Sequence, residues 1–309
     1  MADKMATREA YGKTLVKLGS QYDNLIVMDA DLSGSTKTGE FKKVFPERFI
    51  NMGIAEQDLY GAAAGLAISG KVVCASTFAM FAAGRAFEII RNSIGYTGAN
   101  VKICATHAGI TVGEDGASHQ TFEDIALMRT IPGMTVINPS DGISAEKLIE
   151  QAVAMNGPCY IRLGRASVPI TYNEDDELTI GKGHLIREGK DVTIVATGIM
   201  VNEAIIASDM LSSENIDARV IDIHTIKPLD KEIIVKAARE TGAIVTCEEH
   251  SVIGGLGSAV AEVTSGEAPV RIEMVGQLDT FGESGKPEEL KKKYHMTADD
   301  IVKAVKKVL

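Results

Sequence analysis

The sequence predicts an α/β protein of two domains, each built on a mainly parallel sheet covered by helices. Short apolar runs rich in β-branched residues alternate with amphipathic segments from one end of the chain to the other, a pattern typical of parallel sheets. A chain of 309 residues is long enough for two hydrophobic cores. The alternation is interrupted at residues 169–190, which divide it into two halves.

The first half contains five apolar runs of the length expected for buried strands. They are Asn24–Ala30, Lys71–Thr77, Val101–His107, Thr135–Asn138 and Cys159–Leu163. The segments Ala6–Leu18 and Glu146–Met155 are amphipathic, and Asp58–Ser69 has the composition of a small-residue helix. We therefore expect a first domain at residues 1–172.

The second half repeats the alternation after a polar break. Its strand candidates are Asp191–Thr197, Ala218–Ile223, Ala243–Glu248 and Val270–Met274, and its helix candidates are Asn202–Leu211 and Lys231–Glu240. The break at Pro169–Lys190 includes the acidic run Tyr172-Asn-Glu-Asp-Asp-Glu177, which has no period and is typical of a linker or an exposed crossing segment. We expect a second domain at residues 184–309.

The amino-acid composition and net charge argue against several classes of function. Lys and Arg number 32 and Asp and Glu 42, for a net charge of −10, which argues against a nucleic acid as the main partner. No apolar stretch has the length of a bilayer, and residues 1–8 have no signal-peptide core, so we expect a cytoplasmic protein without membrane association. The four cysteines lie in or beside apolar runs without metal-ligand spacing, which indicates buried, reduced thiols.

Two segments carry residues that could be structural or functional. Glu56 lies in Asn51-Met-Gly-Ile-Ala-Glu-Gln57, just before a predicted helix, where a carboxylate also complements the helix dipole. Phe78 and Phe81 lie in Ser76-Thr-Phe-Ala-Met-Phe81, and an aromatic pair after a strand equally suits a hydrophobic core. Neither segment alone identifies a site.

A glycine-rich loop gives the strongest functional signal. His107 lies in Ala105-Thr-His-Ala-Gly109, and Asp115 and His119 lie in Val112-Gly-Glu-Asp-Gly-Ala-Ser-His-Gln120. Strand-to-helix loops with such residues commonly carry active sites, and imidazole suits proton transfer near neutral pH.

Taken together, these segments resemble the transketolase family. The resemblance implies that Glu56 hydrogen-bonds a ring nitrogen of the aminopyrimidine of thiamine diphosphate and favours the imino tautomer that removes the reactive proton. Phe78 and Phe81 would surround the pyrimidine, and Asp31 in Asp29-Ala-Asp-Leu-Ser-Gly-Ser35 would lie near the cofactor or an interface.

The resemblance also implies residues that bind sugar-phosphate substrates. His119 would stabilise an alkoxide and shuttle protons, and Asp115 would recognise a sugar hydroxyl. Four residues would contact the substrate phosphate: Arg8, Ser35, His107 and Arg165. Guanidinium groups are suited to phosphate because they present planar, permanently charged donors. Arg162 and His250 would be structural, and Asp279–Gly285 would connect the two domains.

One part of the family pattern is missing. Whole transketolases bind the cofactor diphosphate through Mg²⁺ in an N-terminal domain marked by Gly-Asp-Gly, a tripeptide that this sequence lacks. We also find no candidate set of the hard oxygen ligands that Mg²⁺ requires. The resemblance therefore implies the C-terminal subunit of a split transketolase. A separate N-terminal subunit would bind the diphosphate and hold Mg²⁺, and the two kinds of chain would form a heterotetramer that transfers a two-carbon ketol unit.

Alternatives remain open. A deoxyxylulose-phosphate-synthase-like half or a 2-oxo-acid dehydrogenase β-subunit would share several motifs, but Ala105-Thr-His and Gly113-Glu-Asp-Gly favour transketolase. A non-catalytic subunit could also keep the same fold. The intact Glu56, His107 and His119 argue against it.

Overall fold

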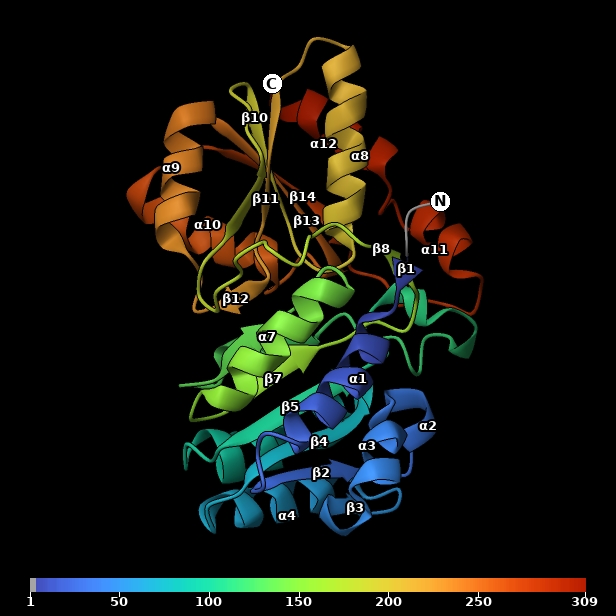
Figure 1. Ribbon diagram of the computed structural model, residues 1–309. Coiled ribbons are helices and arrows are strands. Elements are labelled where there is room, and N and C mark those ends of the chain that lie inside the picture. The colour runs from blue at the N-terminus through green and yellow to red at the C-terminus, as the bar shows by residue number, and fades with distance from the viewer. Residues whose placement is uncertain (1–3) are drawn as a thin grey trace.

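The computed structural model describes residues 4–309. It consists of two α/β lobes, one above the other in Figure 1, and thus has the predicted fold class. Each strand expected from the sequence is present, with ends shifted by a few residues.

The first lobe is built on a seven-stranded sheet in the order β12-β6-β7-β5-β4-β2-β3. Its strands are β2 (Leu25–Asp29), β3 (Phe49–Asn51), β4 (Val72–Phe78), β5 (Val101–Thr106), β6 (Thr135–Ile137), β7 (Cys159–Arg162) and β12 (Thr225–Lys227). Strands β2 to β7 are parallel. Every residue of β4 and β5 is buried, because helices cover both faces of a parallel sheet.

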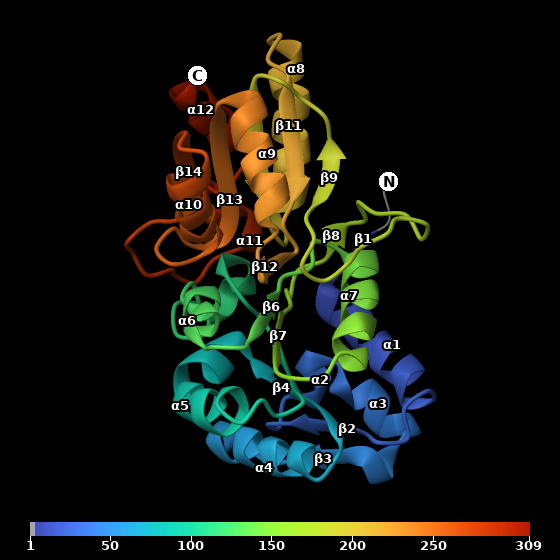
Figure 2. The same ribbon diagram turned by 90° about the vertical axis from the view of Figure 1, so that its left-hand side faces the viewer.

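The helices lie on both faces of the sheet (Figures 1 and 2), and a hydrophobic core fills the space between the sheet and the helices on each face. The helices on one face are α1 (Thr7–Gly19), α3 (Thr38–Val44) and α7 (Gly142–Ala154), and those on the other include α4 (Glu56–Ile68) and α6 (Asp124–Thr130). Shorter pieces are α2 (Ser33–Thr36), the 3₁₀ turns at Pro46–Arg48 and Ile110–Asp115, α5 (Phe87–Ile89), and π-helical segments at Phe81–Arg85 and Ile90–Gly95.

The second lobe is built on a five-stranded sheet in the order β14-β13-β10-β11-β9. Its strands are β9 (His184–Arg187), β10 (Val192–Ala196), β11 (Ala218–Asp222), β13 (Ala243–Ser251) and β14 (Arg271–Gln277), and its helices are α8 (Met200–Ser213), α9 (Lys231–Thr241), α10 (Leu256–Glu267), α11 (Pro287–Lys293) and α12 (Ala298–Val308). All its strands are parallel except the edge strand β9.

The connection between the lobes differs from the expected plain linker. Strand β8 (Val168–Pro169) opens the 169–190 region and pairs with β1 (Lys4–Met5), and β9 closes it. Strand β12 follows the second lobe's β11 in sequence but pairs antiparallel with β6 of the first lobe. Strands of two to four residues, paired with distant segments, leave no local periodicity from which they could be predicted.

Two expectations from composition can be compared with the structure. All four cysteines are buried and free, as predicted. Within residues 4–309, no helix is both long enough and apolar enough to cross a membrane.

Candidate active site

Glu56 is the first residue of α4, on the side of the sheet where the parallel strands end. Its side chain is only 2 % exposed. Ligands of open parallel α/β sheets bind at the carboxyl ends of the strands, and a carboxylate in the first helical turn is stabilised by the helix dipole. The position therefore suits both a structural and a binding role.

The Glu56 carboxylate is engaged by Arg85, which the sequence did not single out. Nη1 of Arg85 lies 2.9 and 2.8 Å from the two carboxylate oxygens, and the half-exposed guanidinium lies 4.6 Å from the centre of the Phe81 ring. Arg85 ends the π-helical turn that begins at Phe81, and π turns are frequent at functional sites. Only its nearness to the aromatic pair could have suggested this residue.

The predicted aromatic pair and the two histidines form one cluster. The Phe78 and Phe81 rings are stacked with centroids 5.9 Å apart. The His107 ring stacks on Phe78 at 3.9 Å, and the His119 ring meets Phe81 edge-on at 5.4 Å. Phe78 is buried and Phe81 is partly exposed, and the Arg85 guanidinium connects the Phe81 ring to Glu56.

His107 is a neutral imidazole whose tautomer is set by Arg8. Nη1 of Arg8 lies 3.3 Å from Nε2 of His107, and a guanidinium can only donate. The ring proton is therefore on Nδ1, which donates to the Thr106 hydroxyl at 2.9 Å. Burial lowers the pKa of His107 to about 3, with further lowering by Arg8, Arg165 and His119.

The predicted phosphate-binding residues lie together. Nη1 of Arg8 also donates to the Ser35 carbonyl at 2.8 Å, so the main chain of Ser35, not its hydroxyl, makes this contact. Nε of Arg8 is buried without a hydrogen-bond partner among residues 4–309. Arg165 donates to the Val112 carbonyl and, at 2.9 Å, to the Glu114 carboxylate. Two guanidinium groups, one of them with an unused donor, have the chemistry needed to bind an anion.

Asp115 and His119 belong to the loop that follows β5. Asp115 is exposed at the end of the 3₁₀ turn Ile110–Asp115, and Nδ1 of His119 lies 3.0 Å from the Ser118 hydroxyl. Gln120 anchors the loop, because its side-chain amide donates to the carbonyls of Ile110, Gly113 and Glu283. The Glu283 contact bears out the expectation that Asp279–Gly285 connects the domains.

Asp31 lies in the loop after β2, with a φ of 62°. Its main-chain N–H donates to Oδ1 of Asn51 at 3.0 Å, and Nδ2 of Asn51 donates back to its carboxylate at 2.9 Å. This pair links the loop after β2 to the segment that leads into Glu56.

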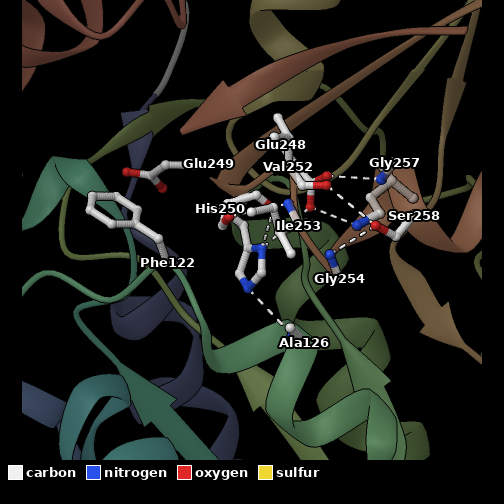
Figure 3. Close-up of polar contacts among 12 residues, drawn as sticks. Phe122, Ala126, Glu248, Glu249, His250, Val252, Ile253, Gly254, Gly257 and Ser258 are labelled. Carbon is white, nitrogen blue, oxygen red and sulfur yellow. Dashed lines mark hydrogen bonds and ion pairs between the residues drawn. The ribbon is translucent and has the colours of Figure 1, made fainter. Parts of the chain in front are cut away.

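Arg162 and His250 are structural, as predicted. Nε of Arg162 lies 2.8 Å from Oδ2 of Asp124, and both side chains are buried. Nε2 of His250 accepts from the Ala126 main-chain N–H at 3.3 Å (Figure 3). Burial lowers the pKa of His250 to about 4. Both residues therefore join β7 and β13 to the start of α6.

The residues present fit one part of the expected cofactor. A buried carboxylate beside stacked aromatic rings suits an aminopyrimidine, which needs a proton-sharing partner and flat apolar surfaces. Within residues 4–309, no group of three or more His, Cys, Asp or Glu side chains is placed to hold a metal ion.

Comparison with known proteins covers both lobes. The family model described as transketolase, pyrimidine binding domain matches residues 3–171, and transketolase, C-terminal domain matches residues 181–301. The chain is 52% identical over 301 residues to a putative transketolase C-terminal section from Methanocaldococcus jannaschii, covering 96% of this chain and 94% of that protein.

Two further relatives differ in length. The chain is 41% identical to a transketolase of Rattus norvegicus over 310 aligned positions, and the match covers 99% of this chain but only 49% of the rat protein. A solved structure titled "Split gene transketolase, inactive beta4 tetramer" is 57% identical with a TM-score of 0.93, and the match covers 99% of this chain and 98% of that one.

Proposed function

This chain belongs to the transketolase family, and we propose that it is the C-terminal subunit of an enzyme that uses thiamine diphosphate to transfer a two-carbon ketol unit between sugar phosphates. The observation that carries the proposal is the buried Glu56 carboxylate, which Arg85 connects to the Phe78–Phe81 stack, with His119 at the edge of the same cluster. A cytoplasmic location is part of the proposal.

Glu56 and the aromatic pair would act on the pyrimidine half of the cofactor. Thiamine diphosphate supplies, when bound, a nucleophilic carbon on its thiazolium ring. Phe78 and Phe81 would supply apolar aromatic surface for the aminopyrimidine, and the Glu56 carboxyl would share a proton with its ring nitrogen. Because Nη1 of Arg85 contacts both Glu56 oxygens, this ion pair has to open or rearrange when the pyrimidine binds.

The remaining residues would bind the substrates. His119 moves a proton at the reacting oxygen, and Asp115 accepts a hydrogen bond from a sugar hydroxyl. Arg8 and Arg165 bind the phosphate, and the unused Nε of Arg8 supports this role. Since Nε2 of His107 accepts from Arg8, His107 orients that guanidinium rather than donating to phosphate from the same nitrogen.

A second kind of subunit would complete the site by binding the diphosphate and Mg²⁺, through charge-assisted contacts and oxygen ligands. Two observations support this half-enzyme proposal. The chain matches about half of the rat transketolase, and the 57%-identical split-gene transketolase is described as an inactive β4 tetramer. We propose a heterotetramer with equal numbers of the two chains.

The test is calorimetric titration of thiamine diphosphate and Mg²⁺ into the purified chain, beside an assay of ketol transfer. The chain alone is expected to bind the cofactor weakly and to show no turnover. Addition of an N-terminal transketolase subunit is expected to give tight binding and activity at a 1:1 ratio of chains. Tight binding and turnover without a partner would refute the half-enzyme proposal.

A further inference from the structure

Glu249 reaches from the second lobe into the loop that carries the proposed substrate residues. It lies on β13 and is 3 % exposed. Its Oε1 accepts a hydrogen bond from the main-chain N–H of Thr111 at 2.6 Å. Thr111 is in the first turn of the 3₁₀ segment Ile110–Asp115, so the carboxylate satisfies a donor that the turn itself leaves free.

The backbone of the loop approaches this carboxylate very closely. A Cβ added at Gly109 would lie 2.2 Å from Cδ of Glu249, and Gly109 has a φ of +80°. Both observations require glycine at this position. Glu248 points to the opposite side of β13 (Figure 3), where its oxygens accept from the N–H groups of Leu256 and Gly257 at the start of α10. The adjacent carboxylates of Glu248 and Glu249 thus bind two different segments, the start of α10 and the loop at Thr111.

The loop held by Glu249 contains three of the six substrate-binding residues proposed above, His107, Asp115 and His119. His107 lies two residues before Gly109, and Asp115 ends the 3₁₀ turn. The Val112 carbonyl of the same turn accepts from Arg165. The loop is therefore fixed at its start by a residue from the other lobe.

We propose that Glu249 is a positioning residue, through which the second lobe fixes the substrate loop, residues 107–120, in its binding geometry. The catalytic consequence rests on the proposed function, whereas the contact with the loop does not. Glu249 acts through Thr111 and touches neither the cofactor site nor Glu56. Its loss therefore impairs steps that involve the sugar substrates and spares activation of the cofactor.

The first experiment is hydrogen exchange on the purified chain, which needs neither cofactor nor partner. The Thr111 amide is expected to be among the protected amides of the loop in the unaltered chain. E249A is expected to accelerate exchange across residues 107–120 by at least about tenfold, as expected for loss of a charge-assisted hydrogen bond. E249Q keeps an acceptor oxygen and retains most of the protection. E248A is the matched control, with faster exchange at the start of α10 and no change in the loop.

The second experiment uses the chain reconstituted with an N-terminal subunit. E249A is expected to lower kcat/KM for ketol donors at least tenfold while exchange of the thiamine C2 proton stays within twofold, and E249Q restores turnover. Rapid exchange of the Thr111 amide in the unaltered chain would overturn the proposal, and this measurement does not depend on whether E249A folds. Unchanged exchange rates across residues 107–120 in folded E249A would also overturn it. Equal losses of turnover and C2 exchange would also overturn it. A complex without ketol transfer refutes the proposed function and leaves the exchange experiment to decide on Glu249.

Discussion

Asp222 makes the stability of the junction between the lobes depend on pH. It ends β11, it is fully buried, and its Oδ2 accepts from the Tyr172 hydroxyl at 2.7 Å and the Ser140 hydroxyl at 3.1 Å. Oδ1 is buried without a hydrogen-bond partner among residues 4–309. Burial raises the pKa of Asp222 from 3.8 to about 7, against the lowering effect of the two hydroxyls.

A raised carboxyl pKa stabilises the fold at low pH. The contribution is fully present below the unfolded pKa of 3.8 and is lost as pH rises through about 7. The folded and unfolded pKa values differ by about three units, and each unit corresponds to about 1.4 kcal/mol in the free energy of unfolding. Ionisation of Asp222 therefore lowers this free energy by up to about 4 kcal/mol at pH 8. Asp222→Asn keeps the acceptor for Tyr172 and Ser140 and removes this cost.

Urea unfolding from pH 4 to pH 8.5 measures the effect as the difference between the Asn variant and the unaltered chain. The difference is expected to grow in favour of Asp222→Asn by up to about 4 kcal/mol as pH rises. Tyr172→Phe, which removes one hydrogen bond that lowers the Asp222 pKa, is expected to move the loss of stability to higher pH. A difference that stays constant across this range would refute the reasoning.

Three further predictions concern the site and its support. Glu56→Ala in the reconstituted complex is expected to reduce turnover by orders of magnitude and to slow C2-proton exchange in parallel, with circular dichroism unchanged; normal exchange would contradict its role. Arg8→Ala is expected to raise KM for phosphorylated donors far more than for hydroxypyruvate in steady-state assays, and equal changes would indicate a structural role. Arg162→Ala leaves the buried Asp124 carboxylate without its ion-pair partner and is expected to cost about 3–5 kcal/mol in urea unfolding; a loss below about 1 kcal/mol would count against a structural pair.

The sequence alone determined the fold class, the main strands and the segments that we propose to form the site. Hydrophobic periodicity is a local property of the sequence. Runs such as Val72–Phe78 can therefore be predicted as buried strands without knowledge of the strands that they pair with. The motif around His107 and His119 also lies within one short stretch. Its residues therefore pointed to a site before any contact between distant segments was known.

Contacts between distant segments were decided by the tertiary structure. Three such contacts are the pairing of β12 with β6, the ion pair of Glu56 with Arg85 and the hydrogen bond of Thr111 to Glu249. They join residues separated by 29 to 138 positions. Each contact depends on the order of the strands or on the packing of the lobes. A hydrogen bond between residues far apart in the sequence produces no periodic sequence pattern from which it could be predicted. The sequence identifies the functional groups, but only the tertiary packing determines which of them are in contact.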